Sequence, residues 1–243
     1  MIQTFLTITQ NTKIAKNTYE MKLQGDISAI TAPGQFVNIK LEEKFLRRPI
    51  SVCDAQDNTL TIIYKTVGSG TDQMSKMQPG KALDILLGLG NGYDSSKSAD
   101  RPLLIGGGAG VPPMYFLARK LIAEGKKVKV ILGFNSLDEM FYEDKFTALG
   151  AEVYTATADG SYGIKGFVTD VMKTLDYSYF YTCGPEPMLK AIDKIAETSG
   201  QFSFEERMGC GFGACMGCSC KTKYGNKRIC RDGPVLTREE IIW

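Results

Sequence analysis

Four cysteines near the end of this 243-residue chain constrain its fold more than any other feature. Cys210, Cys215, Cys218 and Cys230 form a C-x4-C-x2-C run with a distant fourth cysteine, which is the ligand spacing of a plant-type 2Fe-2S cluster. The residues between them are mostly small, so the backbone can fold tightly around two irons and direct N–H groups at the sulfides. The run predicts a redox protein in which these four cysteines are the metal ligands.

The cysteines also allow other interpretations. A structural zinc site usually contains two C-x2-C pairs, and only Cys215 and Cys218 form one here. Cys215 and Cys220 are also separated by four residues, but no cysteine follows at Thr222 or Lys223, so we interpret Cys220 as a spare thiol. Disulfides fit poorly, because the chain has seven cysteines, an odd number. Iron-sulfur ligation is favoured, and zinc is the main alternative.

Composition excludes several classes of function. The chain contains no histidine, which rules out Ser-His-Asp and Cys-His catalysis, Rieske ligation and H-E-x-x-H zinc chemistry. Its net charge of +2 is too small to indicate a nucleic-acid partner. It begins without an apolar signal stretch and has no apolar run of membrane-spanning length. We therefore expect a cytoplasmic protein that does not enter the membrane.

The chain divides into three regions by pattern. Residues 1–98 carry short alternating apolar runs separated by Gly, Pro, Asn and Asp, which predicts an antiparallel barrel or sandwich. Small polar residues at 95–100 mark a candidate linker. Residues 99–204 alternate strand-like runs (103–105, 128–134, 153–156, 179–183) with helical stretches (114–124, 186–198), which predicts a parallel α/β sheet.

Residues 205–243 are rich in Gly, Cys and Lys and show no lasting periodicity. A segment this short buries too little apolar surface to order itself, so we expect a metal cluster to hold it together.

A glycine-rich turn follows the first strand of the α/β region. Gly106, Gly107, Gly108 and Gly110 precede a probable helix that begins near Pro112 and Pro113. Such a turn lets the backbone approach a pyrophosphate, and the helix N-terminus offers free N–H groups. The match to G-x-G-x-x-G is imperfect, so an ordinary strand-to-helix turn remains an alternative.

Two further motifs lie in the first region. Arg48-Pro49-Ile50-Ser51 could supply a guanidinium to a diphosphate and a hydroxyl to a ring nitrogen, although an arginine here could also be a solvated charge. Its neighbour Arg47 is expected to be the more exposed of the two. Gly68-Ser69-Gly70-Thr71 offers a second tight turn with free N–H groups, and its alternative is a hairpin loop.

Taken in order, these motifs resemble a known family. R-P-I-S, G-S-G-T, G-L-G-N-G-Y at 88–93, G-G-G-A-G-V-P-P at 106–113 and C-G-P-E-P-M at 183–188 are similar to the ferredoxin-NADP reductase superfamily. The terminal E-R-M-G-C-G-F-G-A-C-M-G-C resembles the electron-transfer subunits of class 1B dihydroorotate dehydrogenases. The resemblance covers essentially the whole chain.

The resemblance implies three parts: an antiparallel FAD-binding β-barrel at 1–98, a parallel-sheet NAD-binding α/β domain at 99–204 and a small 2Fe-2S domain at 205–243. Arg48 would hold the FAD diphosphate, and Ser51 would face the isoalloxazine. The position of Ile50 is usually tyrosine in the superfamily. The remaining implied cofactor residues are Pro49, Ile63, Tyr64, Lys65, Gly70 and Thr71 for FAD, and Gly106, Gly107, Gly108, Gly110, Cys183 and Gly184 for the nucleotide. Cys183 could instead be a small buried residue that ends a strand.

The implied function is electron relay. An FMN-containing catalytic subunit, in a heterotetramer of two copies of each chain, would oxidise dihydroorotate for pyrimidine biosynthesis. Electrons would pass through 2Fe-2S and FAD to NAD+. The strand ending at Phe134-Asn135 carries neither an acidic residue for a ribose 2′-hydroxyl nor an arginine for a 2′-phosphate, and we favour NAD. Alternatives are the small subunit of an NADPH-dependent ferredoxin or sulfide oxidoreductase, or a zinc-stabilised nucleotide-binding regulator.

Overall fold

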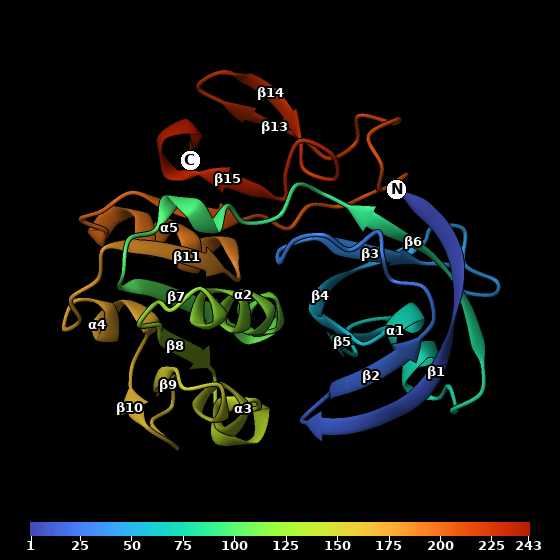
Figure 1. Ribbon diagram of the computed structural model, residues 1–243, viewed down its shortest axis with the longest axis horizontal. Coiled ribbons are helices and arrows are strands. Elements are labelled where there is room, and N and C mark those ends of the chain that lie inside the picture. The colour runs from blue at the N-terminus through green and yellow to red at the C-terminus, as the bar shows by residue number, and fades with distance from the viewer.

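The computed structural model describes residues 1–243 and contains a barrel, an open sheet and a C-terminal hairpin (Figure 1). The barrel is closed and entirely antiparallel, in the strand order β1-β2-β5-β4-β3-β6. Its strands are β1 (Ile2–Ala15), β2 (Thr18–Gln24), β3 (Phe36–Ile39), β4 (Arg48–Gln56), β5 (Thr59–Lys65) and β6 (Ala82–Leu89). The barrel predicted from the alternating pattern is confirmed.

Period-two alternation explains how the barrel is filled. Leu6 and Ile8 on β1 and Leu60 and Ile62 on β5 are at most 1% exposed and pack in one core inside the barrel. The G-S-G-T motif, predicted as a tight turn, instead begins the short helix α1 (Ser69–Ser75).

The second region is a seven-stranded sheet in the order β10-β9-β8-β7-β11-β12-β15. The first six strands are parallel, and β15 is antiparallel to β12. The strands are β7 (Pro102–Gly107), β8 (Lys129–Phe134), β9 (Glu152–Thr157), β10 (Ile164–Lys165), β11 (Tyr179–Cys183), β12 (Gly200–Ser203) and β15 (Val235–Thr237). The helices are α2 (Val111–Ala123), α3 (Glu143–Ala148), α4 (Val168–Met172) and α5 (Glu186–Ile195). The parallel α/β sheet is confirmed.

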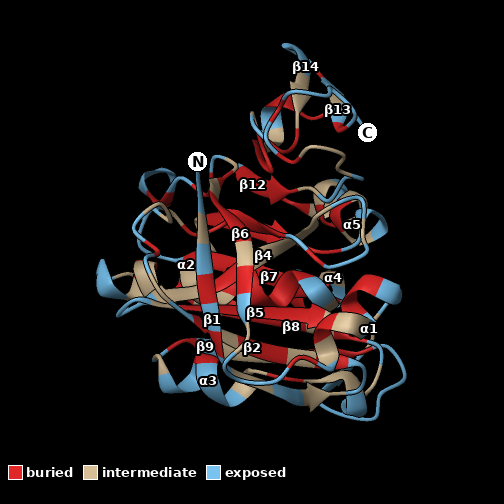
Figure 2. Ribbon diagram, turned by 90° about the vertical axis from the view of Figure 1, so that its right-hand side faces the viewer, coloured by how far each residue is buried: buried red, intermediate tan, exposed pale blue.

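The C-terminal segment packs on both other regions. Its hairpin of β13 (Ser219–Thr222) and β14 (Gly225–Arg228) projects at the top of the molecule, above the barrel and the sheet (Figures 1 and 2). Ile229, Leu236 and Ile241 nevertheless join a core that includes Phe36 of the barrel and Phe180 of the sheet. The segment therefore buries apolar side chains of its own. Its strand β15 also pairs with β12 of the α/β sheet, although the sequence predicted a domain boundary near residue 205 between them.

The barrel and the sheet are also joined directly. Cys53 and Ile63 of the barrel belong to the same buried core as α2. The candidate linker at 95–100 is held in place, because the ammonium of Lys126 donates hydrogen bonds to the carbonyls of Ser95 and Ser98. No helix in the structure has both the length and the apolar character that crossing a membrane requires.

Candidate functional site

The R-P-I-S and G-S-G-T motifs meet at one end of the barrel. A Cβ added to Gly70 would lie 2.3 Å from Nε of Arg48, so the guanidinium lies directly over the start of α1. The hydroxyl oxygen of Thr71 accepts hydrogen bonds from the N–H groups of Val67 (3.0 Å) and Gly68 (3.3 Å), and these two bonds fix the turn. An arginine beside a tight turn of backbone fits a diphosphate.

Arg47 is not the exposed charge that the sequence predicted. Its Nη2 lies 3.0 and 3.1 Å from the two carboxylate oxygens of Asp84, and its Nη1 donates to the Asp84 carbonyl at 3.0 Å. Arg47 and Asp84 retain only 20% and 14% of their side-chain exposure. Arg47 therefore ties the loop before β4 to strand β6, a role that its position beside Arg48 did not reveal.

The other residues expected beside the flavin differ in what they can offer. Pro49, Ile50 and Ser51 follow Arg48 on β4 and are half-buried. Ile63 and Tyr64 are 5% and 3% exposed, and the Tyr64 hydroxyl donates to Oδ1 of Asn11 at 2.9 Å inside the barrel. The side chains of these two residues are therefore packed inside the protein, and their contact with a flavin stays a prediction.

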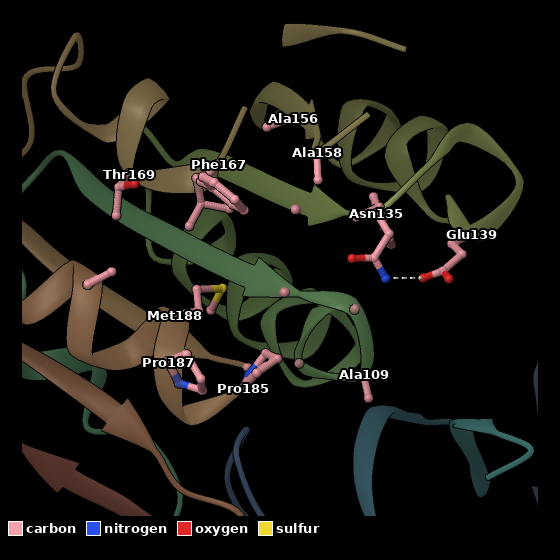
Figure 3. Close-up of a pocket in the computed structure, with 18 of the residues that line it drawn as sticks. Ala109, Asn135, Glu139, Ala156, Ala158, Phe167, Thr169, Pro185, Pro187 and Met188 are labelled. Carbon is pink, nitrogen blue, oxygen red and sulfur yellow. Dashed lines mark hydrogen bonds between the residues drawn. The ribbon is translucent and has the colours of Figure 1, made fainter. Parts of the chain in front are cut away.

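A cavity of about 610 Å³ lies at the carboxyl ends of the parallel strands (Figure 3). Ligands of open α/β sheets bind at this edge. Of the predicted nucleotide residues, the cavity is lined by Gly107, Gly108, Gly110 and Gly184. Lys65, which was expected beside the flavin, reaches this cavity from the barrel.

The glycine-rich turn and the end of β11 are in direct contact. A Cβ on Gly110 would lie 2.1 Å from the Cys183 carbonyl oxygen, which no larger residue could accommodate without displacing the backbone. Gly110 is also the N-cap of α2, and Pro112 and Pro113 lie in the first turn of this helix as expected. The two motifs thus form one wall.

Gly106 and Cys183 lie behind that wall. A Cβ on Gly106 would lie 2.8 Å from Cα of Val111, and Cys183 is 2% exposed. Burial raises the pKa of the Cys183 thiol to about 12, so it is neutral at pH 7. A contact between Cys183 and a nicotinamide stays a prediction.

Sequence reasoning missed an acidic residue in the cavity wall. Glu139, in the short 3-10 helix η3 (Leu137–Glu139), accepts a hydrogen bond from Nδ2 of Asn135 at 3.0 Å (Figure 3). It accepts another from the ammonium of Lys65 at 2.8 Å. The ion pair with Lys65 lowers the pKa of Glu139, so it is a carboxylate at pH 7. The end of β8 has no acidic residue of its own, but Glu139, four residues after Asn135, folds back and contacts Asn135.

Glu205 is a second residue that was missed. It lines the cavity two residues after the end of β12, and desolvation raises the pKa of its carboxyl group. Its position at the start of the Gly- and Cys-rich segment gave no signal in the sequence.

The four predicted metal ligands form two pairs. The N–H of Cys210 lies 3.4 Å from Sγ of Cys215, and the N–H of Cys230 lies 3.4 Å from Sγ of Cys218. No group of three or more Cys, Asp or Glu side chains forms a site for a single metal ion. This pairing is compatible with two irons that each take two cysteine ligands.

Backbone donors already surround the first sulfur. Burial acts to raise the pKa of Cys210, but the N–H groups of Phe212, Cys215 and Ala214 outweigh it and lower the pKa to about 6. Thiolates are the form that binds metal. Cys220 lies apart on β13, opposite Lys227, and burial raises the pKa of its thiol.

Two family models match the chain. The iron-sulfur cluster binding domain of dihydroorotate dehydrogenase B matches residues 205–242, and an oxidoreductase NAD-binding domain matches residues 104–194. The solved structure of an NADH-dependent reduced ferredoxin-NADP oxidoreductase is 28% identical, with a TM-score of 0.90, covering 98% of this chain and 90% of that one. A ferredoxin NADP+ reductase from Neisseria gonorrhoeae, 18% identical with a TM-score of 0.67 over 79% of this chain and 89% of its own, shares the fold.

Curated relatives match over nearly their whole length. The dihydroorotate dehydrogenase B (NAD(+)) electron transfer subunit of Fusobacterium nucleatum is 46% identical, covering 97% of this chain and 96% of the relative. That of Bacillus pumilus is also 46% identical, covering 99% of this chain and 98% of the relative. The chain belongs to the family of dihydroorotate dehydrogenase B (NAD(+)) electron transfer subunits.

Proposed function

We propose that this chain receives electrons from a partner that oxidises dihydroorotate, and that it passes these electrons on to NAD+. The observation that carries the proposal is the pairing of Cys210 with Cys215 and of Cys218 with Cys230 in a chain that also holds a nucleotide cavity. A 2Fe-2S cluster transfers single electrons, and FAD can collect two of them and release a hydride, so the two groups together connect a one-electron route to NAD+.

The protein's own residues would bind and position these groups. Arg48 and the turn at Gly70 and Thr71 would hold the FAD diphosphate, and Ser51 would contact the isoalloxazine. The backbone at Gly107, Gly108, Gly110 and Gly184 would receive the nucleotide, with Gly106 and Cys183 supporting it from behind. No histidine or other general acid-base residue is needed for this role.

Glu139 supports NAD over NADP. A carboxylate held in the cavity wall can accept a hydrogen bond from a ribose 2′-hydroxyl, and it would repel a 2′-phosphate. The relatives' names specify NAD(+) as well. Glu139→Gln is expected to reduce the preference for NADH over NADPH, as measured by the ratio of kcat/KM values in dye reduction.

The partner is proposed to be an FMN-containing catalytic subunit, in a cytoplasmic heterotetramer of two copies of each chain. The name "electron transfer subunit" of the relatives implies a catalytic partner, and FMN and the stoichiometry are our inference. Within this chain we assign FAD to residues 1–98, NAD to 99–204 and the cluster to 205–243.

Two other functions predict different behaviour. A ferredoxin oxidoreductase subunit is suggested by the neighbour at 28% identity, but relatives at 46% carry the dihydroorotate dehydrogenase name. Assaying the complex with dihydroorotate, ferredoxin and polysulfide separates these two. A zinc-stabilised regulator would be colourless, whereas flavin with iron-sulfur gives a brown protein.

The decisive experiment uses the isolated chain and the complex. The isolated chain should reduce a dye with NADH and show no activity towards dihydroorotate, and adding the partner should restore dihydroorotate-dependent NAD+ reduction. Cys215→Ser should abolish the coupled reaction and spare the NADH-dye reaction. Coupling at the native rate without the cluster would contradict the proposal.

A further inference from the structure

Asn38 is a buried polar residue that no motif singled out. It lies on β3 between Val37 and Ile39, which are fully buried in the barrel core. Because side chains alternate along a strand, Asn38 projects from the outer surface of the barrel. It is nevertheless only 1% exposed, since the cysteine segment covers it.

The contact between Asn38 and the segment is made at the first predicted metal ligand. Nδ2 of Asn38 donates to the carbonyl of Cys210 at 3.3 Å. Gly211 follows with φ of +78°, and a Cβ there would lie 2.3 Å from the same Nδ2. The backbone of Cys210 and Gly211 therefore packs directly against the side-chain amide of Asn38, at the start of the run of cysteines.

On the barrel side, Asn38 lies opposite the R-P-I-S motif. In the antiparallel pairing of β3 with β4, Asn38 faces Pro49, Ile39 faces Arg48 and Phe36 faces Ser51. The Asn38 carbonyl accepts a hydrogen bond from Arg47 at 3.4 Å, and Arg47 is itself held by Asp84. The strand that carries Asn38 is therefore fixed between the predicted flavin residues and β6.

The amide is also incomplete. Its Oδ1 is buried and has no hydrogen-bond partner. Most buried polar atoms have one, so the contact of Nδ2 with the Cys210 carbonyl is the single hydrogen bond that fixes this side chain.

We propose that Asn38 is a positioning residue that sets the place of the iron-sulfur cluster relative to the flavin. It connects the first cluster cysteine to the strand paired with the flavin motif through one side chain. The inference rests on the proposed function, because it requires both cofactors to be present. Asn38 itself transfers no electron.

The test compares Asn38→Asp with Asn91→Asp in purified, cofactor-loaded protein. Asn91 is a matched control, because it also holds the C-terminal segment, with Nδ2 2.8 Å from the Val235 carbonyl and Oδ1 3.1 Å from the Val235 N–H, but its side-chain hydrogen bonds go to Asp232 and Val235 and not to a cysteine. Asn38→Asp places a carboxylate against the Cys210 carbonyl. Asn38→Ala, which removes the contact without repulsion, serves as a second variant if the first does not fold.

The readouts are iron content, the electron paramagnetic resonance spectrum of the reduced cluster, and the rate at which NADH-reduced flavin passes electrons to the cluster. We expect the Asn38 variants to keep FAD and NADH-dye activity, to change the spectrum and to slow cluster reduction by about tenfold, as displacement of positioned groups does. Asn91→Asp should leave spectrum and rate unchanged. Wild-type spectrum and rate in both Asn38 variants would overturn the inference, whereas wild-type protein without iron would overturn the proposed function.

Discussion

The nucleotide cavity and the cysteine segment are built in opposite ways. The cavity is walled by buried parallel strands and by glycines such as Gly110, which lies against the Cys183 carbonyl with no room for a Cβ. The cysteine segment is fixed at its two ends, where Cys210 is held by Asn38 and Cys218 is buried, while residues 214–217 between them are exposed. Buried packing preforms the first site, whereas the exposed residues of the second have few contacts, and we expect a bound metal to complete it.

Removing a proposed cluster ligand should give the largest effect, and it should affect the cysteine segment without affecting the nucleotide cavity. Cys215→Ser is expected to lose its iron and all coupled activity, because Cys215 is a proposed ligand that is exposed and has little packing to replace the metal. NADH-dye activity should survive, since the cavity does not depend on the segment's loop. Iron analysis and the two assays measure this.

Cys220→Ser is the control, because Cys220 lies on β13 apart from the two sulfur pairs. It should retain iron. Loss of iron in Cys220→Ser together with retention in Cys230→Ser would show that the fourth ligand has been misassigned.

The next largest effect is expected at Arg48 and the turn at Gly70 and Thr71, which we propose to hold the FAD diphosphate and which is a third site. Arg48→Ala should weaken FAD binding by about 2 to 3 kcal/mol, the range for a lost hydrogen bond to a charged group. Flavin content after purification and titration of the apoprotein with FAD measure it.

Arg47 is unsuitable as a control, because Arg47→Ala would break the ion pair with Asp84 and loosen the barrel. Lys40→Ala is better, since Lys40 is exposed at the end of the same strand pair. If Arg48→Ala and Lys40→Ala bind FAD equally well, Arg48 does not belong to the site.

A methyl group in the cavity wall tests whether the cavity is preformed. Gly110→Ala should raise the KM for NADH by about tenfold or more, because the added Cβ must displace the Cys183 carbonyl. Lys40→Ala is its control as well, since Lys40 is exposed and does not line the cavity. Unchanged KM in Gly110→Ala would mean that the wall adapts and that the contrast with the cysteine segment is smaller than the structure indicates.

The sequence predicted what depends on local pattern. Alternation predicted the barrel, strand and helix periods predicted the parallel sheet, and β11 begins and ends at Tyr179 and Cys183 as expected. Cysteine spacing selected four residues that the structure arranges in two pairs.

The sequence could not predict contacts between residues far apart in the chain. Arg47 was misjudged because its partner Asp84 is 37 residues away. Asn38 and Cys210 are separated by 172 residues, and Lys65 and Glu139 by 74. The premise that the C-terminal segment buries too little apolar surface to order itself was wrong for the same reason, because Ile229, Leu236 and Ile241 bury against distant strands.

The smallest effect is expected where the barrel meets the nucleotide domain. Glu20 on β2 is 3% exposed, and its carboxylate lies 2.8 Å from the ammonium of Lys145 and 2.6 Å from the hydroxyl of Tyr142. Burial acts to raise the pKa of Glu20, but Lys145 and Tyr142 outweigh it and lower the pKa below the ordinary 4.5. Because the folded pKa is the lower one, this stabilisation is present at neutral pH and is lost as the pH falls through the folded pKa.

Glu20→Gln should therefore lower the free energy of unfolding by about 1 to 3 kcal/mol at pH 7 and by less at pH 4, as measured by urea titration at the two values. Glu42→Gln, which removes an ion pair between Lys81 and a carboxylate that is 75% exposed, should change it by less than about 1 kcal/mol. Equal losses in the two variants, or a loss in Glu20→Gln that does not shrink at pH 4, would show that the charge of Glu20 does not hold the two regions together. The preformed cavity would then owe its geometry to the shared apolar core of Cys53, Ile63 and α2 alone.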